Sequence, residues 1–182
     1  MTVLKTEIEG LIIIQPKIFY DSRGYFFESF NSEALHKEGI NFNPVQDNES
    51  KSAKGVIRGL HYQLNPHSQS KLIGVTEGKI FDVALDLRKD SKTFGKWYGV
   101  ELDSESKKQF LIPRGFAHGF SVLSDTAIIQ YKCDNTYNPA MERGINIMDP
   151  ELDIDWKIDR NAYIISDKDI KNPLFKDAEF NF

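Results

Sequence analysis

The segment FDVALDLR, residues 81–88, decides the fold, because its apolar and polar residues alternate almost one by one. Alternation with a period of two is typical of a β-strand, whose successive side chains point to opposite faces of a sheet. We therefore predict a strand here with one buried face and one polar face. The buried face carries Phe81, Val83, Leu85 and Leu87, and the polar face carries Asp82, Asp86 and Arg88.

Short apolar runs of the same kind recur along the chain and are separated by turn residues. They cover residues 11–15, 71–75, 109–112, 116–123 and 127–133. Helical spacing is convincing only over residues 32–38, with Asn31 or Ser32 as the N-cap and Gly39 after the last turn, and a second short helix is expected from Ser166. Many short strands with little helix favour an all-β sandwich or barrel, and a closed barrel can hold one small ligand inside.

The composition is that of one ordinary globular domain spanning residues 1–182. Apolar residues make up 40% and charged residues 27% of the chain, and no repeat or low-complexity linker divides it. The net charge of −4 argues against nucleic-acid binding, which needs a surplus of Lys and Arg. The one cysteine, Cys133, fits a reducing compartment, and neither a signal peptide nor a membrane-spanning run is recognisable. We therefore expect a cytoplasmic protein with no membrane or nucleic-acid partner.

The segment RGLHYQ, residues 58–63, followed by Lys71, places two cations and an imidazole close together in the sequence. In a regular strand His61 and Gln63 share a face, while Arg58 points to the opposite face. Bringing Arg58 and His61 to one side therefore requires a β-bulge near Gly59. From these residues alone, His61 is either an ordinary packed histidine or a catalytic base.

The segment PRGFAHGF, residues 113–120, places His118 among apolar and aromatic residues. A buried imidazole needs a hydrogen-bond partner, so a satisfied core histidine is one interpretation. The spacing from Pro113 to His118 also resembles the second motif of the cupin superfamily, whose double-stranded β-helix barrels often bind a metal through histidines. Here the metal-binding pattern is incomplete, because Gln63 stands where a histidine would follow His61. We expect no metal.

Two further segments carry polar groups that suit catalysis. In YKCDNTY, residues 131–137, Tyr131 is in phase with apolar neighbours, and a core tyrosine with a satisfied hydroxyl is the alternative interpretation. In SDKD, residues 166–169, Ser166 is placed to cap a helix, and Asp167 and Asp169 fall in its first turn. Helix capping alone would explain those acids.

Together these segments closely resemble the dTDP-4-dehydrorhamnose 3,5-epimerase family over nearly the whole chain. The resemblance rests on the joint order and spacing of several motifs. Besides the segments above, these are DSRG at 21–24, FDVALDLRKDSKTFGKW at 81–97, ERGI at 142–145 and DPELDIDW at 149–156. The chain departs from the family pattern at residues 147–148, where packing should be affected, and at residues 134–136, where sugar specificity could change.

The resemblance implies a cupin-type double-stranded β-helix, a jelly-roll barrel with a few short helices. It also implies inversion at C3 and C5 of dTDP-4-dehydro-6-deoxy-D-glucose to give dTDP-4-dehydro-L-rhamnose, in dTDP-L-rhamnose biosynthesis. By resemblance, His61 is the base that removes a proton beside the C4 ketone, and Asp167 orients its imidazole. Tyr131 is the acid that protonates the opposite face, and Lys71 steadies the enolate oxygen. No cofactor is implied.

The resemblance further implies which residues hold the substrate. They are Arg23, Arg58 and Lys168 for the phosphates, Glu28, Gln46 and Asn48 for the base or sugar, His118 for the sugar, Tyr137 and Glu142 for the nucleoside, and Phe19 or Tyr137 for stacking on thymine. In the family an N-terminal segment reaches a neighbouring subunit's site. We therefore expect a homodimer with shared active sites, in which Arg23 and Glu28 act across the interface.

Three other functions stay open at this point. A related enzyme that inverts only C3 or only C5 would keep both His61 and Tyr131. A metal-dependent cupin oxygenase or isomerase would bind iron or nickel stoichiometrically. A non-catalytic nucleotide-sugar binding module would keep the phosphate-binding cations but would have no use for the set of His61, Tyr131 and Asp167.

Overall fold

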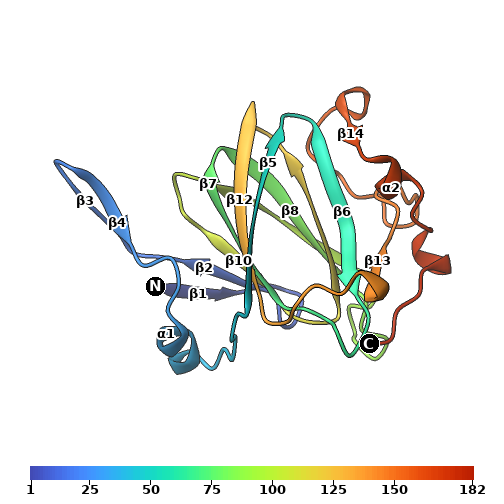
Figure 1. Cartoon of the computed structure of the whole chain (residues 1–182), viewed down its shortest axis with the longest axis horizontal. Coiled ribbons are helices and arrows are strands. Elements are labelled where there is room, and N and C mark those ends of the chain that lie inside the picture. Colours follow the sequence, from blue (N-terminus) through green and yellow to red (C-terminus); the bar gives the residue numbers. More distant parts are fainter.

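Two mainly antiparallel β-sheets face each other, and the computed structural model describes residues 1–182 (Figure 1). The first sheet has the strand order β1 (Thr2–Lys5), β2 (Ile12–Gln15), β10 (Gln109–Ile112), β7 (Lys71–Glu77), β12 (Thr126–Cys133) and β5 (Gln46–Ala53). The second has the order β13 (Glu142–Gly144), β6 (Val56–Gln63), β11 (Phe116–Val122), β8 (Lys79–Asp86) and β9 (Trp97–Asp103), and β14 (Ile164–Ile165) pairs with β6 in parallel. This is the all-β architecture that we predicted.

Both predicted helices are present and are short. Helix α1 spans Ser32–Lys37, where Asn31 Oδ1 accepts a hydrogen bond from the Ala34 backbone N–H, and Gly39 follows the helix. Helix α2 spans Asp167–Ile170 and is capped by Ser166. Single 3₁₀ turns lie at Pro139–Met141, Arg160–Ala162 and Phe175–Asp177. None of the helices has the length and apolar character needed to cross a membrane.

Strand β8 is buried on both faces, so our prediction of one polar, exposed face is wrong. The face that carries Phe81 packs against the C-terminal segment around Trp156. The other face lies between the two sheets, and its Asp82 and Asp86 are fully buried. This arises because β8 lies between β11 and β9 in the sheet and is covered from both sides. The buried carboxylates are hydrogen-bonded by an imidazole and a guanidinium, which allows aspartates at these positions.

The β-bulge that we predicted near Gly59 is confirmed. Gly59 and Leu60 of β6 together face Gly119 of β11, because the pairing between these strands shifts there by one residue. The extra residue turns the strand, so that Arg58 and His61 line the same cavity.

Strands β3 (Ile18–Asp21) and β4 (Gly24–Phe27) form a separate hairpin that extends away from the barrel (Figure 1). Its large aromatic side chains are solvent-exposed and include Phe19, Tyr20, Tyr25 and Phe26. A lone two-stranded hairpin is marginally stable in water, and a group of exposed aromatic side chains commonly marks an interaction surface.

We expect Gly59→Ala to lower the free energy of unfolding by about 2–4 kcal/mol. Gly59 has φ +143°, and a Cβ there would lie 2.5 Å from the Gly119 Cα, where only backbone could yield. Urea unfolding followed by tryptophan fluorescence measures the change. Gly74→Ala is the control, because its Cβ would meet only the flexible Gln109 side chain at 3.6 Å. A Gly59→Ala protein as stable as the control would contradict the close approach.

Candidate active site

A cavity of about 550 Å³ opens between the sheets beside α2 and collects most of the predicted catalytic and phosphate-binding residues. Its polar lining includes Arg58, His61, Lys71, His118, Tyr131, Lys168 and Asp169. A neighbouring cavity of about 230 Å³ shares His61, Lys71 and Tyr131 with the first. It adds the predicted residues Gln46, Asn48, Tyr137 and Glu142. The two cavities therefore form one site with the proposed catalytic groups at their junction.

His61 is hydrogen-bonded to Asp169, with 2.6 Å between Nε2 and Oδ1, and not to Asp167. Our assignment of Asp167 is thus corrected. Successive residues of a helix are about 100° apart, so the first and third residues of α2 point in different directions. Asp169 is 3% exposed and faces β6, whereas Asp167 is exposed to solvent. Both acids fall in the first turn after Ser166, and spacing alone did not distinguish them.

The pair fixes which nitrogen of His61 is free. Burial raises the pKa of Asp169, but the hydrogen bond and charge of His61, together with hydrogen bonds from Ser166 and the Gly59 backbone, outweigh this effect, so the pKa of the carboxyl lies below its ordinary value. An ionised carboxylate only accepts hydrogen bonds, so His61 Nε2–H donates to it. In the neutral imidazole Nδ1 then carries a lone pair that can accept a proton.

Tyr131 and Lys71 lie on adjacent strands of the first sheet. Cys133, two residues after Tyr131 on β12, is paired in register with Lys71 of β7, so all three point into the barrel. Burial raises the pKa of Tyr131 above its ordinary value, which keeps the phenol protonated at neutral pH. Burial lowers the pKa of Lys71, although the Cys133 thiol and the carboxylates of Asp82 and Glu142 oppose this shift.

His118 is both a buried histidine and part of the cavity lining. Its Nε2 lies 2.5 Å from Oδ1 of Asp82, and the Asp82 side chain is fully buried. The other carboxylate oxygen of Asp82 has no hydrogen-bond partner. The two interpretations of His118 are therefore compatible, since one ring nitrogen is satisfied by Asp82 while the residue lines the site.

Two of the three predicted phosphate-binding cations line the larger cavity. Arg58 is anchored there by a hydrogen bond from Nε to Ser52 Oγ at 3.1 Å. Lys168 forms an ion pair with Glu142, which also accepts a hydrogen bond from the Tyr137 hydroxyl at 3.0 Å. Burial raises the pKa of Glu142. The hydrogen bonds from Lys168 and Tyr137 and the nearby positive charges lower it by a larger amount, so the net pKa is below the ordinary value.

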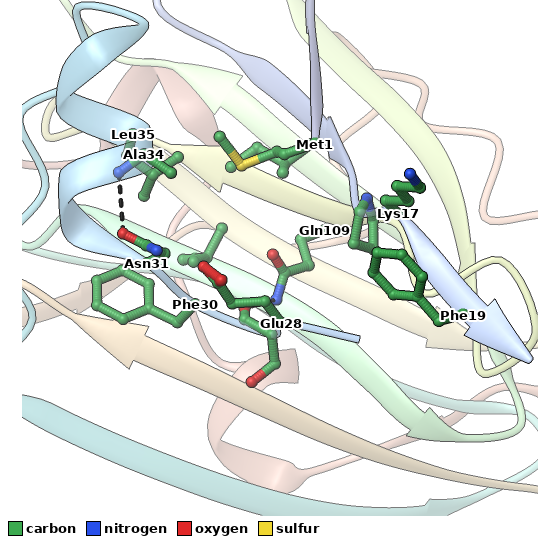
Figure 2. Close-up of a pocket in the computed structure, with 13 residues that line it drawn as sticks. Met1, Lys17, Phe19, Glu28, Phe30, Asn31, Ala34, Leu35 and Gln109 are labelled. Carbon is green, nitrogen blue, oxygen red and sulfur yellow. Dashed lines mark hydrogen bonds between the residues drawn. The ribbon is translucent and has the colours of Figure 1, made fainter. Parts of the chain in front are cut away.

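The remaining predicted residues lie on or near the projecting hairpin, away from this site. Arg23 is at the hairpin tip, where its guanidinium pairs with Asp21 and its side chain is 88% exposed. Phe19 and Glu28 line a separate cavity of about 300 Å³ beside α1 (Figure 2). Within one chain, therefore, Phe19, Arg23 and Glu28 are not brought to His61.

Sequence reasoning missed Asp169 as the partner of His61, and it missed Asp82 as the partner of His118. Asp82 was placed on a polar face, and the sequence gives no direct signal of a partner 36 residues away. The structure contains no group of three or more His, Cys, Asp or Glu side chains placed to hold a metal ion.

Comparisons with known proteins identify similar enzymes. A family model described as dTDP-4-dehydrorhamnose 3,5-epimerase matches residues 5–177. The dTDP-4-dehydrorhamnose 3,5-epimerase of Shigella flexneri is 51% identical over 181 residues, which are 99% of each chain. The crystal structure of the enzyme of that name from Elizabethkingia anophelis NUHP1 matches with a TM-score of 0.93 and 51% identity over 97% of each chain.

A third relative has been solved with a sugar nucleotide. The dTDP-6-deoxy-D-glucose-3,5-epimerase of Legionella pneumophila Philadelphia 1, in complex with dTDP-4-keto-L-rhamnose, matches with a TM-score of 0.92 and 48% identity, covering 96% of this chain and 93% of that one. These structural matches confirm the predicted cupin-type barrel. Because the family model spans most of the chain and half-identical relatives cover nearly all of it, the chain belongs to the dTDP-4-dehydrorhamnose 3,5-epimerase family.

Proposed function

We propose that the chain inverts C3 and C5 of dTDP-4-dehydro-6-deoxy-D-glucose and so forms dTDP-4-dehydro-L-rhamnose for dTDP-L-rhamnose biosynthesis. One observation carries the proposal. His61 on β6 and Tyr131 on β12 belong to opposite sheets and line the same cavity. Inversion of a carbon needs a base on one face of the sugar ring and an acid on the other, and two facing sheets supply that arrangement.

The reaction begins when Nδ1 of His61 accepts the proton from the carbon beside the ketone. The electron pair left behind forms an enolate, whose negative charge collects on the C4 oxygen. Lys71 stabilises that oxygen as a fixed positive charge in a partly dehydrated site. The Tyr131 hydroxyl then donates a proton to the opposite face, and the C–H bond re-forms with inverted configuration. Asp169 holds the imidazole and stabilises the imidazolium during this step.

The nucleotide end is held by charge and by a flat aromatic surface. Arg58 and Lys168 bind the two phosphates, for which the planar arginine fork is well suited. Gln46, Asn48 and Glu142 offer hydrogen bonds to the sugar or the base, and His118 to the reacting sugar. Tyr137 lies at the rim as a stacking surface for thymine.

Protons leave and return at the same carbons, so the reaction needs no external oxidant, reductant or organic cofactor. The ketone of the substrate itself acidifies the neighbouring C–H bonds. We place the reaction in the cytoplasm, where the free, buried Cys133 would stay reduced.

We further propose a homodimer in which the β3–β4 hairpin of one subunit completes the site of the other. The hairpin presents exposed aromatic residues and a cation at its tip but contacts little of its own barrel. Docking on a second copy would bury those aromatics and bring Arg23, Phe19 and Glu28 to a substrate that they do not reach within one chain.

Proton NMR in deuterated water tests the function with metal-free protein and dTDP-4-keto-6-deoxyglucose. We expect deuterium at both C3 and C5 and formation of the L-lyxo ketosugar. Tyr131→Phe should still exchange on the base's face but lose most of the inverted product. Label at one carbon only would identify a single-site epimerase instead, and exchange that depends on added iron or nickel would support a metal-dependent cupin enzyme.

Replacing each acid of α2 separates the two assignments. We expect Asp169→Asn to lower kcat about 100-fold or more, because an amide no longer fixes the tautomer or stabilises the imidazolium. Asp167→Asn is the matched control and should stay within about threefold of the wild type, a range set by the small effect of exposed substitutions. Initial rates from a coupled reductase assay measure both. Equal losses, or a larger loss in Asp167→Asn, would return the role to Asp167.

Heterodimers test whether Arg23 acts across the interface. We expect Arg23→Ala alone to lower kcat/KM by about 10- to 100-fold, the usual cost of a lost charge-assisted hydrogen bond. A heterodimer of Arg23→Ala and His61→Ala subunits, isolated with two affinity tags, has one intact site if Arg23 serves its partner. Its activity should then reach about half that of the wild type. No recovery in a verified heterodimer would mean that Arg23 serves its own subunit.

A further inference from the structure

Gln63 is a buried polar residue next to the catalytic centre that the mechanism does not use. It lies on β6 two residues after His61 and is 4% exposed. Its Nε2 donates to the backbone carbonyls of His67 at 2.7 Å and Thr136 at 3.3 Å, and its Oε1 accepts from the Asn138 backbone N–H at 2.6 Å. One carboxamide therefore hydrogen-bonds two loops, the one that contains His67 and the one at residues 134–138, to the strand that carries His61.

The loop of residues 134–138 is held from the opposite sheet as well. Gln46 Oε1, on β5, accepts a hydrogen bond from the Tyr137 backbone N–H at 2.8 Å. The amide nitrogen of Gln46 donates to Asn48 Oδ1 at 2.9 Å, so the group is already engaged. Two glutamine carboxamides, one from each sheet, thus accept hydrogen bonds from the adjacent backbone N–H groups of Tyr137 and Asn138.

The loop of residues 134–138 forms one side of the part of the site that would bind the nucleotide. The Tyr137 hydroxyl donates to Glu142, which is paired with Lys168 and lies opposite Gln63 in the β13–β6 register. Tyr137 is half exposed at the rim of the smaller cavity. A shift of the loop would move the ring and disturb the hydrogen bond from its hydroxyl to Glu142, which is paired with Lys168. His61 would not move, because it is held separately by Asp169.

We propose that Gln63 is a positioning residue that fixes the 134–138 loop, and through it the Tyr137 ring, for binding of the nucleotide, while leaving proton transfer to His61 unchanged. This rests on the proposed function for its ligand. The role needs a donor and an acceptor in a single buried group, which a carboxamide supplies. Glutamate of the same size offers only acceptors, and leucine offers neither, so each would leave buried backbone groups unsatisfied.

The test compares Gln63→Leu and Gln63→Glu with the wild type by calorimetric titration with dTDP and by steady-state kinetics. We expect Gln63→Leu to raise both the Kd for dTDP and the KM by about 10-fold or more, with kcat within about threefold. Gln63→Glu keeps the acceptor for Asn138 and should show a smaller change in the same direction. If Gln63→Leu fails to fold, Gln63→Glu carries the same test.

Gln15→Leu is the matched control, since Gln15 Nε2 donates to the Ser106 carbonyl at 2.8 Å and the residue lines neither cavity. It should leave Kd, KM and kcat unchanged. Wild-type affinity for dTDP in both Gln63 variants, or a fall in kcat with KM unchanged, would overturn the proposal.

Amide hydrogen exchange provides a readout that does not depend on the proposed substrate. A peptide covering residues 134–138 should exchange at least about 10-fold faster in Gln63→Leu than in Gln15→Leu, because its backbone has lost its hydrogen bonds to the buried Gln63 carboxamide. Unchanged exchange would overturn the proposal directly. If the wild type does not bind dTDP while exchange behaves as expected, then dTDP is not the ligand. The conclusion that Gln63 fixes the 134–138 loop would still hold.

Discussion

The chemistry of this barrel depends on one close approach of backbone to backbone, between Gly59 and Gly119. Strands β6 and β11 come together there because neither residue has a side chain, and the extra residue on β6 turns the strand. Without that bulge, Arg58 and His61 would point to opposite faces of the sheet. The residues that we propose as the phosphate-binding cation and the catalytic base would then lie on different sides of the sheet, and they could not act on the same substrate.

Polar groups inside the barrel are held mostly in pairs, and the pairs set their directions. His61 is bound to Asp169 and His118 to Asp82, while the Gln63 carboxamide is satisfied by three backbone groups. A buried polar group without a partner costs free energy, so each of these pairs has one strongly preferred geometry. The interior is therefore organised before a substrate arrives, which is what stabilisation of a developing enolate requires.

Much of the architecture was predictable from the sequence, and the failures have physical causes. Period-two alternation located β8 but did not indicate that its aspartate face is turned into the barrel, because buried carboxylates with partners look like exposed ones in a sequence. Strand β5 was not predicted, since QDNESKSA has few apolar residues to alternate. Of the residues that the family resemblance implied, His61, Lys71 and Tyr131 line one cavity, whereas Asp167 was chosen over Asp169, because only the helix phase decides which acid faces His61.

The bond between His61 and Asp169 joins residues that are 108 positions apart in the chain. Synthesis runs from the N-terminus, so strands β1 to β13, which end at Gly144, are all synthesised before Asp169. The imidazole of His61 is therefore made long before its partner, and their hydrogen bond cannot form until α2 has been synthesised. The residue that we propose as the base is thus oriented only when the polypeptide is nearly complete.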